Sequence, residues 1–583
     1  MKNIIVYYLA IILPVPFLVW VSKSGISDSR PRQKINKTFI FQMMRRIALV
    51  LIVTLVSLTG KTQPSLTNTR TISAEVLKDK ISGGWAGKMI GVTYGAPVEF
   101  KALCKTFDDP ITWVPSDVIG SKEQDDLYVQ LTFLMTMDQY GIDAPAKRFQ
   151  EQFAKAGYML WHANVQARKN YFDSIFPPKS GYPEYNLHAD DIDFQIEADY
   201  IGFMCPGMPL TAKKLADKVG HIMNYGDGVY GGIFIGALYS QAYFENDIPK
   251  IIKKALLSIP AESDYARIIN DVIVLHHHYP SDWRASWKEL EAKWGSVHIC
   301  EAGAPFNIDA KLNGAYVVMG LLYGEGDPLK TMEITARCGQ DADCNPSNAM
   351  AVLGVVKGLS GLPKEYREAV QKMGDTLFIY TDYTFNKAVR QTLKYAKEIA
   401  VQNGGESTDK NLKIKVQNPQ PYVAEVAFPK LVADHRVSVF KKDGWQFKGT
   451  WAVYNTNDED KDNKLFDQAK YSTKTGDEAI LNFEGTGISV CGNWHRECGQ
   501  AEIYIDGKLK RTIDEYFWYA NQTQNDMDLY HVTNLKPGKH SLKVVVKGQK
   551  RAEATGATIY LTKAIIFKTE PKKNETYKFP FLK

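Results

Sequence analysis

The spacing of apolar residues changes near residue 416, and this change limits the folds open to the 583-residue chain. Before it, apolar residues recur three and four positions apart, as in helices with one buried face. This pattern runs through residues 124–140, 233–244, 312–323 and 348–359. After it, apolar and polar residues alternate, as in strands with one buried face. The alternation is clearest in residues 478–483, 501–505, 540–546 and 557–561.

These patterns predict a multidomain chain. We expect a compact all-α domain over residues 70–402 and a Lys-, Asn- and Gly-rich linker over 403–415. An antiparallel β-sandwich then follows over residues 416–570, with a tail over 571–583. Asp506-Gly507 and Lys536-Pro537-Gly538 supply turns between the expected strands.

Two carboxylates, Asp341 and Asp343, lie one residue apart between Cys338 and Pro346. Asn345 is a favourable N-cap and Pro346 a favourable first helical residue, so a helix should begin there. Both acids would then be presented from a loop beside a helix start. Oxygen ligands in this arrangement suit Mg²⁺ or Mn²⁺. The alternative is an Asx-rich turn that binds no metal.

A second acid pair, Asp125-Asp126, also lies at an expected helix start. Ser121 and Gln124 have the spacing of a capping box, which predicts a helix beginning near Lys122. The acids could merely complement the helix dipole. Two such pairs, however, are what a two-metal site needs, in which the ions polarise a leaving group and activate water.

A third motif runs from Gly83 to Phe100 and contains a Gly-Ala-Pro turn followed by Val98 and Glu99. Its glycines at 83, 87 and 91 form a smooth strip on one helix face, which permits another helix to approach closely. The three motifs together resemble those of ADP-ribosylglycohydrolases of the dinitrogenase-reductase-activating type. The resemblance extends from about Ser73 to about Val401.

The resemblance implies one or two Mg²⁺ or Mn²⁺ ions bound by the two acid pairs, with Gln124 as a further carbonyl ligand. It implies that Glu99 corresponds to the family's mobile glutamate at the metal centre. The expected catalytic residues are Glu99, Asp126 and Asp343, and the expected metal ligands are Asp125, Asp126, Asp341 and Asp343. The chain departs from the family pattern at three positions, where Gln124 and Cys344 replace Thr and Val92 replaces Asp.

Two further segments are expected to shape a substrate pocket. The first, residues 188–200, is rich in acids and includes Asp191 and Asp193; its alternative is a solvated acidic face. The second, residues 224–232, is a Gly-rich loop before an apolar helix, where a phosphate or sugar hydroxyl could bind; its alternative is a connecting turn. The residues of this loop taken as substrate-binding are Asn224, Tyr225, Gly226 and Asp227. A Thr-His pair that the family's ADP-ribose-cleaving members carry is replaced by Asn224-Tyr225, which favours a glycan over ADP-ribose.

The C-terminal strands around residues 483–490 and 505–508 resemble galactose-binding-like, jelly-roll modules appended to carbohydrate enzymes. Such modules can present aromatic side chains to a sugar. Trp494 and Trp518 are the candidates for such a platform, and burial in the core is the alternative.

The formal charge of +6 arises from the N-terminus. Residues 64–583 hold 62 basic and 64 acidic side chains, so the electrostatic footprint of a nucleic-acid-binding protein is missing. Residues 1–63 are interpreted as a targeting region, with a signal peptide over 43–63. The simplest account is a translation start at Met43 or Met44; the rival is that the run from Ile4 to Val21 spans a membrane. We expect export to the periplasm or beyond, with no stable span after signal cleavage.

Seven cysteines leave disulfide pairing open. Cys491 could pair with Cys498, and a Cys338–Cys344 bridge would clamp the Asp341–Asp343 segment. Buried free thiols are the alternative.

The sequence therefore predicts an exported, metal-dependent hydrolase of glycosidic bonds. Its substrate would be an ADP-ribosyl group or a glycan. The alternative is a secreted carbohydrate-binding protein whose helical domain has lost catalysis, an interpretation that Gln124 and Cys344 keep open.

Overall fold

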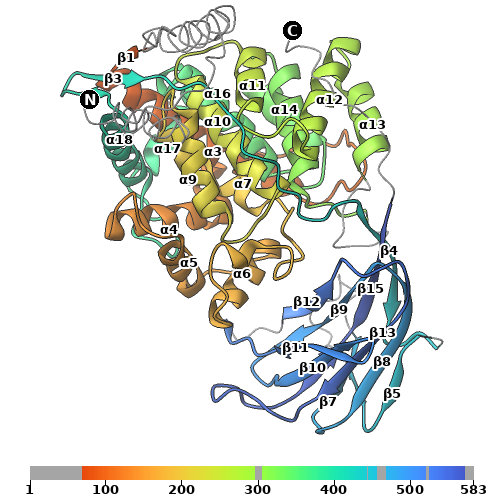
Figure 1. Cartoon of the computed structure of the whole chain (residues 1–583). Helices are drawn as coiled ribbons and strands as arrows, with labels where there is room; N and C mark the ends of the chain where they lie inside the picture. Colours follow the sequence, from red (N-terminus) through yellow and green to blue (C-terminus); the bar gives the residue numbers. More distant parts are fainter. Residues whose placement is uncertain (1–68, 296–304, 443, 456–467, 520–523, 571–583) are drawn as a thin grey trace, which may run out of the picture. The chain divides into compact units, whose positions relative to one another are not determined.

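A computed structural model describes residues 69–295, 305–442, 444–455, 468–519 and 524–570 (Figure 1). The chain divides into two compact units, residues 1–67 and 68–583, and the described residues belong to the second. The predicted signal peptide, the apolar run from Ile4 to Val21 and the tail over 571–583 lie outside the described residues. None of the described helices combines the length and the apolar character needed to cross a bilayer.

Residues 74–402 form the helical domain, as the periodicity predicted. The α-helices are α3 (Ala74–Gly95), α4 (Asp125–Tyr140), α5 (Ala146–Lys155), α6 (His162–Phe172), α7 (Asp193–Glu197), α8 (Asp199–Phe203), α9 (Pro209–Gly220), α10 (Asp227–Ala242), α11 (Ile248–Leu256), α12 (Asp264–His278), α13 (Trp283–Trp294), α14 (Ala310–Tyr323), α15 (Pro328–Arg337), α16 (Cys344–Lys357), α17 (Lys364–Lys372) and α18 (Phe385–Gln402). Short 3₁₀ helices join them: η2 (Ala96–Val98), η3 (Pro115–Glu123), η4 (Lys179–Gly181) and η5 (Leu359–Gly361).

The helices α3 and α16 pack side by side along the glycine strip (Figure 1). A Cβ atom placed on Gly83, Gly87 or Gly91 would lie 2.1, 2.4 or 2.3 Å from a backbone carbonyl oxygen of α16. Real Cβ atoms do not approach so closely, so only glycine permits this backbone-to-backbone contact. The predicted close helix approach is therefore present, and α16 is the helix that follows the Asp341–Asp343 loop.

The segment expected to be a linker is instead folded onto the helical domain. Strand β3 (Asn411–Lys415) pairs antiparallel with β1 (Thr69–Ser73) on one side and with β2 (Glu406–Ser407) on the other. Its Leu412 and Ile414 are fully buried, whereas the other three residues of the strand, Asn411, Lys413 and Lys415, are exposed. This short alternation was overlooked because polar Lys and Asn residues surround it.

The C-terminal region is built from antiparallel sheets, as predicted. One sheet has the strand order β11-β10-β13-β8-β5, a second has β12-β9-β15-β4, and a third has β14-β7-β6. The strands are β4 (Leu431–Ser438), β5 (Gln446–Lys448), β6 (Ala452–Asn455), β7 (Gln468–Ser472), β8 (Glu478–Gly485), β9 (Gly487–Trp494), β10 (Gln500–Ile505), β11 (Lys508–Asp514), β12 (Gln524–Val532), β13 (Gly538–Val546), β14 (Ile559–Leu561) and β15 (Lys563–Thr569). Asp506 and Gly507, with φ of 51° and 73°, form the tight β10–β11 turn that the sequence indicated.

The structure does not support an aromatic platform at Trp494. Its side chain is only 3% exposed, with Phe517 packed against it and the Lys169 ammonium over its ring. A buried indole has no free face for a sugar. Trp518 is half-buried and packs against Phe172 and Phe517.

All six cysteines in the described part of the chain are free thiols. The sulfur of Cys491 lies 3.6 Å from Ser489 Oγ, whereas that of Cys498 contacts the carbonyl of Asn493. Neither of the two bridges considered from the sequence is present, and the Asp341–Asp343 loop is held without one.

The α3–α16 contact can be tested by filling the strip. Gly87→Ala places a methyl group 2.4 Å from the Met350 carbonyl oxygen, so we expect the free energy of unfolding to fall by about 1–3 kcal/mol. Gly236→Ala in α10 is the matched control, because its nearest neighbour would be 3.8 Å away and alanine favours a helix by roughly 0.5–1 kcal/mol. Chemical denaturation of both variants measures the difference; equal stability would contradict the packing argument.

Candidate active site

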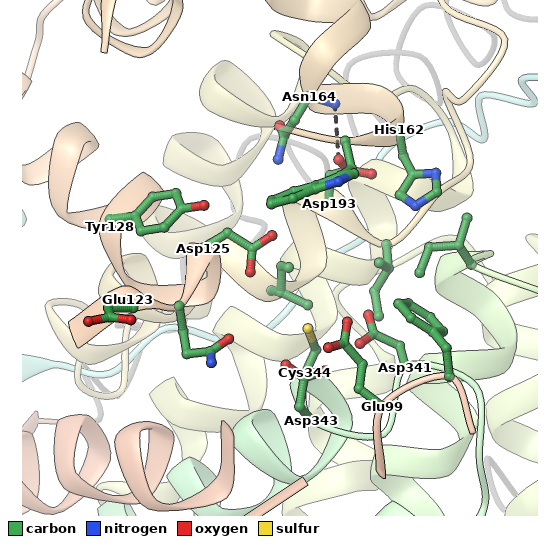
Figure 2. Close-up of a pocket in the computed structure, with 16 residues that line it drawn as sticks. Glu99, Glu123, Asp125, Tyr128, His162, Asn164, Asp193, Asp341, Asp343 and Cys344 are labelled. Carbon is green, nitrogen blue, oxygen red and sulfur yellow. Dashed lines mark hydrogen bonds between the residues drawn. The ribbon is translucent and has the colours of Figure 1, made fainter. Parts of the chain in front are cut away.

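A pocket in the helical domain brings together residues from six separate segments (Figure 2). Six of the described lining residues are acids and none is lysine or arginine. The pocket is lined by Glu99, Phe100, Glu123, Gln124, Asp125, Tyr128, Trp161, His162, Asn164, Ile192, Asp193, Ile196, Ile308, Asp341, Asp343 and Cys344. Both predicted acid pairs contribute to this region, although Asp126 is fully buried and is not itself among the lining residues.

The first acid pair lies in the first turn of α4, as predicted, although the helix begins later than expected. Gln124 is the N-cap and makes no side-chain capping bond, so the predicted capping box with Ser121 is wrong. The 3₁₀ helix η3 occupies the preceding residues and sets a different backbone path. Asp125 is half-buried at the pocket, and burial together with the charges of Asp126 and Asp343 raises its pKa to about 7.

The second pair is presented from the loop between α15 and α16. The helix α16 begins at Cys344 with Asp343 as its N-cap, two residues before the start predicted at Pro346. Asn345 is therefore inside the helix, where its side chain donates to Asn313. Asp341 and Asp343 are each 2% exposed. Burial and the neighbouring carboxylates raise the pKa of both groups.

Hydrogen bonds tie the Glu99 turn to this loop. The amide of Phe100 donates to the carbonyl of Gln340 at 3.1 Å, and the amide of Gln340 donates to the carbonyl of Ala102 at 2.9 Å. Glu99 is thereby held beside Asp341 and Asp343, and Figure 2 shows the three side chains together. Glu99 is exposed toward the open pocket, and partial burial together with the charges of Asp343, Asp125 and Asp126 raises its pKa to about 8.

The residues present fit a divalent cation. One oxygen each of Asp126, Asp341 and Asp343 is buried without a hydrogen-bond partner. Burying unpaired carboxylate oxygens is costly, and a bound cation removes that cost. One potential ligand atom each from Asp341, Asp343 and Cys344 lies within 4.8 Å of the other two. The thiol is a poor ligand for a hard ion, so the oxygens decide the fit.

Behind the pocket, a lysine that the sequence analysis missed compensates part of the negative charge. The Lys88 ammonium lies 2.7 Å from Asp126 Oδ2 and 2.9 Å from Asp199 Oδ2, and donates to the carbonyl of Ile196 at 2.9 Å. All three charged side chains are fully buried. Burial lowers the pKa of Lys88, but the two carboxylates outweigh it and the pKa is raised. The sequence did contain a signal for this residue, because Lys88 is a charged residue directly after Gly87 in a helix that is otherwise glycine-rich and apolar there.

Asp193 lines the pocket, and its backbone lies at the start of α7. Its Oδ1 accepts a hydrogen bond from the amide of Asn164 at 3.0 Å, drawn dashed in Figure 2, whereas Oδ2 is buried without a partner. Burial and the charge of Asp191 raise the pKa of Asp193 to about 8. Asp191 lies outside the pocket lining and pairs with His188 at 2.7 Å.

The predicted substrate residues of the 224–227 loop are not among the residues that line the pocket. The Asn224 side chain accepts from the amide of Phe194 at 3.0 Å and donates to the carbonyl of Asp191 at 2.8 Å. Asp227 accepts from the amide of Tyr265, and the Tyr225 ring packs against those of Tyr182 and His221. Gly226 allows the turn with φ of 56°. This loop supports the segment that carries Asp191 and Asp193.

Trp161, His162 and Tyr128 line the pocket and were not predicted. Trp161 is 49% exposed and Tyr128 is stacked on Tyr158. Trp161 and His162 lie at the start of α6, and Tyr128 belongs to the apolar pattern of α4. In neither place does the sequence distinguish a residue that lines a pocket from one that packs in the core.

Comparisons with known proteins agree with the helical architecture. The sequence model of a family described as ADP-ribosylglycohydrolase matches residues 73–396. A relative from Flavonifractor plautii, named A type blood alpha-D-galactosamine galactosaminidase, is 30% identical over 104 residues. That stretch is 17% of this chain and 8% of the relative, so the chain spans less than a tenth of the relative's length.

Two solved structures illustrate more distant likenesses. An ADP-ribosylglycohydrolase-related protein complex is 14% identical, covers 55% of this chain and 98% of its own, and has a TM-score of 0.37. A carbohydrate-binding module, CBM36 in complex with calcium and xylotriose, is 13% identical, covers 23% of this chain and 98% of its own, and has a TM-score of 0.15. Both scores are too low to add to the assignment. The family match alone covers more than half of the sequence, and the chain belongs to the ADP-ribosylglycohydrolase family.

Proposed function

We propose that this chain is a metal-dependent hydrolase of glycosidic bonds that acts on a neutral glycan or glycoside. Membership of the family supports glycohydrolase activity. The observation that carries the proposal is the pocket itself, where six acids and no described lysine or arginine face one space. Within this region, oxygens of Asp126, Asp341 and Asp343 are buried without hydrogen-bond partners, and a bound cation would remove the cost of burying them.

The cation ligands would be Asp125, Asp126, Asp341 and Asp343, with the Gln124 carbonyl as a further candidate. Mg²⁺ or Mn²⁺ suits this oxygen-rich set. Lys88 already engages Asp126 Oδ2, which leaves Oδ1 of that residue for an ion. When bound, the ion supplies a positive charge that orients sugar hydroxyls and lowers the pKa of a nearby water.

The remaining chemistry is proton transfer by the protein. Glu99 is exposed to the pocket beside Asp343 and is the proposed acceptor of the water proton, with Asp126 and Asp343 as the other candidates. Burial and the neighbouring acids raise the pKa of Glu99 to about 8, and the positive charge of a bound cation would lower it again and favour the carboxylate that accepts the proton. Asp193 would donate a proton to the leaving oxygen, because its raised pKa keeps the carboxyl protonated at neutral pH and its Oδ2 has no other partner. The amide of Asn164 fixes the orientation of Asp193.

The charge of the pocket bears on the substrate. ADP-ribose carries a diphosphate, whose negative charge would meet six carboxylic side chains and no described lysine or arginine. A neutral sugar meets no such penalty, and the half-exposed Trp161 ring offers an apolar face for it. The family description favours the second candidate, an ADP-ribosyl group.

A catalytically impaired carbohydrate-binding protein is the competing function. Cys344 in the ligand set favours it, because a thiol binds hard cations poorly. The apolar segment over residues 43–63 supports export to the periplasm or the extracellular space, where glycans are available.

Metal binding should be visible as stabilisation. Added at about 100 times its Kd, Mg²⁺ or Mn²⁺ should stabilise the EDTA-treated protein by about 2.7 kcal/mol and raise its Tm accordingly. The double variant Asp341→Asn, Asp343→Asn should lose this response. Without metal it should be at least as stable as the wild type, since the cost of burying two neighbouring acidic groups is removed. A wild-type Tm unaffected by either ion would contradict the metal site.

Catalysis can be tested with a panel of neutral glycosides and glycans beside ADP-ribosylated peptides. We expect hydrolysis of a neutral glycoside that requires Mg²⁺ or Mn²⁺ and falls at least ~100-fold in Asp125→Asn and in Asp343→Asn. Asp117→Asn, a change to an acid in the 3₁₀ helix η3 outside the pocket lining, is the control. Cleavage of ADP-ribosyl bonds alone would overturn the substrate choice, and binding without any cleavage would favour the competing function.

The role of Asp193 predicts a pH dependence. A carboxyl with a pKa raised to about 8 donates a proton below that pH and loses it above, so activity should fall as the pH rises through about 8. Asp193→Asn should lower kcat by about 10²–10⁴-fold and remove this alkaline limb from the remaining activity. If the activity of Asp193→Asn still falls as the pH rises through about 8, the titrating group is not Asp193.

A further inference from the structure

Three side chains outside the two acid pairs converge beside the pocket. Asp191 Oδ2 lies 2.7 Å from His188 Nδ1 and 3.9 Å from His162 Nδ1. One potential ligand atom from each residue lies within 4.8 Å of the other two. Two imidazole nitrogens and one carboxylate oxygen form a donor set that Zn²⁺ accepts readily, whereas Mg²⁺ prefers oxygen alone. We propose that His162, His188 and Asp191 form a second metal site, separate from the carboxylate site, that binds Zn²⁺.

The segment that carries His188 and Asp191 is fixed before any ion binds. The amide of His188 donates to the Asn186 side chain at 3.0 Å. Asp191 forms an isolated β-bridge with Asp309, and its carbonyl accepts from the Asn224 side chain at 2.8 Å. Ligands on a preorganised backbone lose little freedom on binding a metal, which favours affinity.

His162 is held in an unusual conformation that directs its ring to the cluster. It is the first residue of α6 and has φ of 45°, a left-handed conformation that non-glycine residues seldom adopt. Its ring stacks on Phe306 with centroids 5.6 Å apart and meets the His188 ring edge-on at 5.7 Å. These two ring contacts limit the rotation of the imidazole.

Other histidine–carboxylate pairs in the described residues lack a second imidazole. His435 pairs with Asp434 at 2.7 Å, and His540 pairs with Asp506 at 2.8 Å. Only the groups His162–His188–Asp191 and Asp341–Asp343–Cys344 meet the geometric requirement for a metal in the part of the chain that is described. A hydrogen-bonded His188–Asp191 pair accounts for two of the three side chains and leaves the position of His162 beside them unexplained.

Charge and access also favour a cation here. The carboxylate of Asp528, in strand β12, adds negative potential at His188. The side chains of His162 and His188 are 28% and 17% exposed, so an ion can enter from solvent, while Asp191 at 5% forms the buried base of the site. His162 lines the pocket. Three protein ligands leave a Zn²⁺ position for water or a substrate group.

Metal content tests the proposal independently of hydrolysis. The full chain is stripped with EDTA, held in excess Mg²⁺ and dialysed against micromolar ZnCl₂, and bound zinc is measured by mass spectrometry. We expect about one zinc ion per chain, and at least a tenfold loss of zinc affinity in His162→Ala and in His188→Ala. Co²⁺ in place of Zn²⁺ should give visible absorption bands that both variants lose.

Matched variants locate the site. His435→Ala removes an exposed imidazole from a similar pair and should keep the zinc, as should Asp341→Asn in the carboxylate site. Circular dichroism establishes that each variant is folded, and the partly exposed His162 supplies a second test if His188→Ala does not fold. The proposal is overturned if the wild type retains no zinc, if both histidine variants retain it fully, or if Asp341→Asn abolishes it.

Discussion

The contact between α3 and α16 is the constraint on which the site depends. Its glycines allow two helix backbones to touch, and the strip ends at the functional loops rather than in the core. A Cβ atom on Gly95, the last residue of α3, would lie 1.9 Å from the carbonyl oxygen of Ala342. Ala342 separates the two acids of the second pair. The same packing therefore sets the position of the Glu99 turn, which leaves α3, against the Asp341–Asp343 loop, which enters α16.

The charges of the site are arranged at the expense of stability. Asp126, Asp341 and Asp343 are almost fully buried, and burial together with the neighbouring carboxylates raises the pKa of Asp341 and Asp343, which favours the neutral forms of these two groups. Lys88 offsets the charge of Asp126 and Asp199 from the core side, where no water reaches. The described lining of the pocket contains no lysine or arginine, so the remaining negative charge is available to a cation. One part of the negative charge is thus neutralised by a lysine of the protein, and the other part is left for a ligand. Functional sites commonly accept such a loss of stability.

The sequence predicted what depends on local pattern and missed what depends on tertiary placement. The helical and strand periods, the glycine strip and the Asp506-Gly507 turn follow from residue spacing. The helix starts at Asp125 and Cys344 were misplaced because η3 and the Gly339-Gln340 turn override the capping signals. Asn224 was read as a pocket residue because a Gly-rich loop before a helix resembles an anion site. Its side chain instead forms hydrogen bonds with backbone groups of the neighbouring segment.

Three residues in the loops of the site have a strained backbone. Phe100, His162 and Gln340 have φ of 51°, 45° and 56°, in the left-handed region that disfavours side chains. Phe100 and His162 line the pocket, and Gln340 directly precedes Asp341. Each such conformation costs about 1–3 kcal/mol and persists only where its surroundings enforce it. For Phe100 and Gln340, the Phe100–Gln340 and Gln340–Ala102 hydrogen bonds hold the backbone in this conformation. The helices supply a rigid frame, and the strained turns aim the carboxylates and the imidazole into the pocket, an arrangement that regular helix ends alone do not provide.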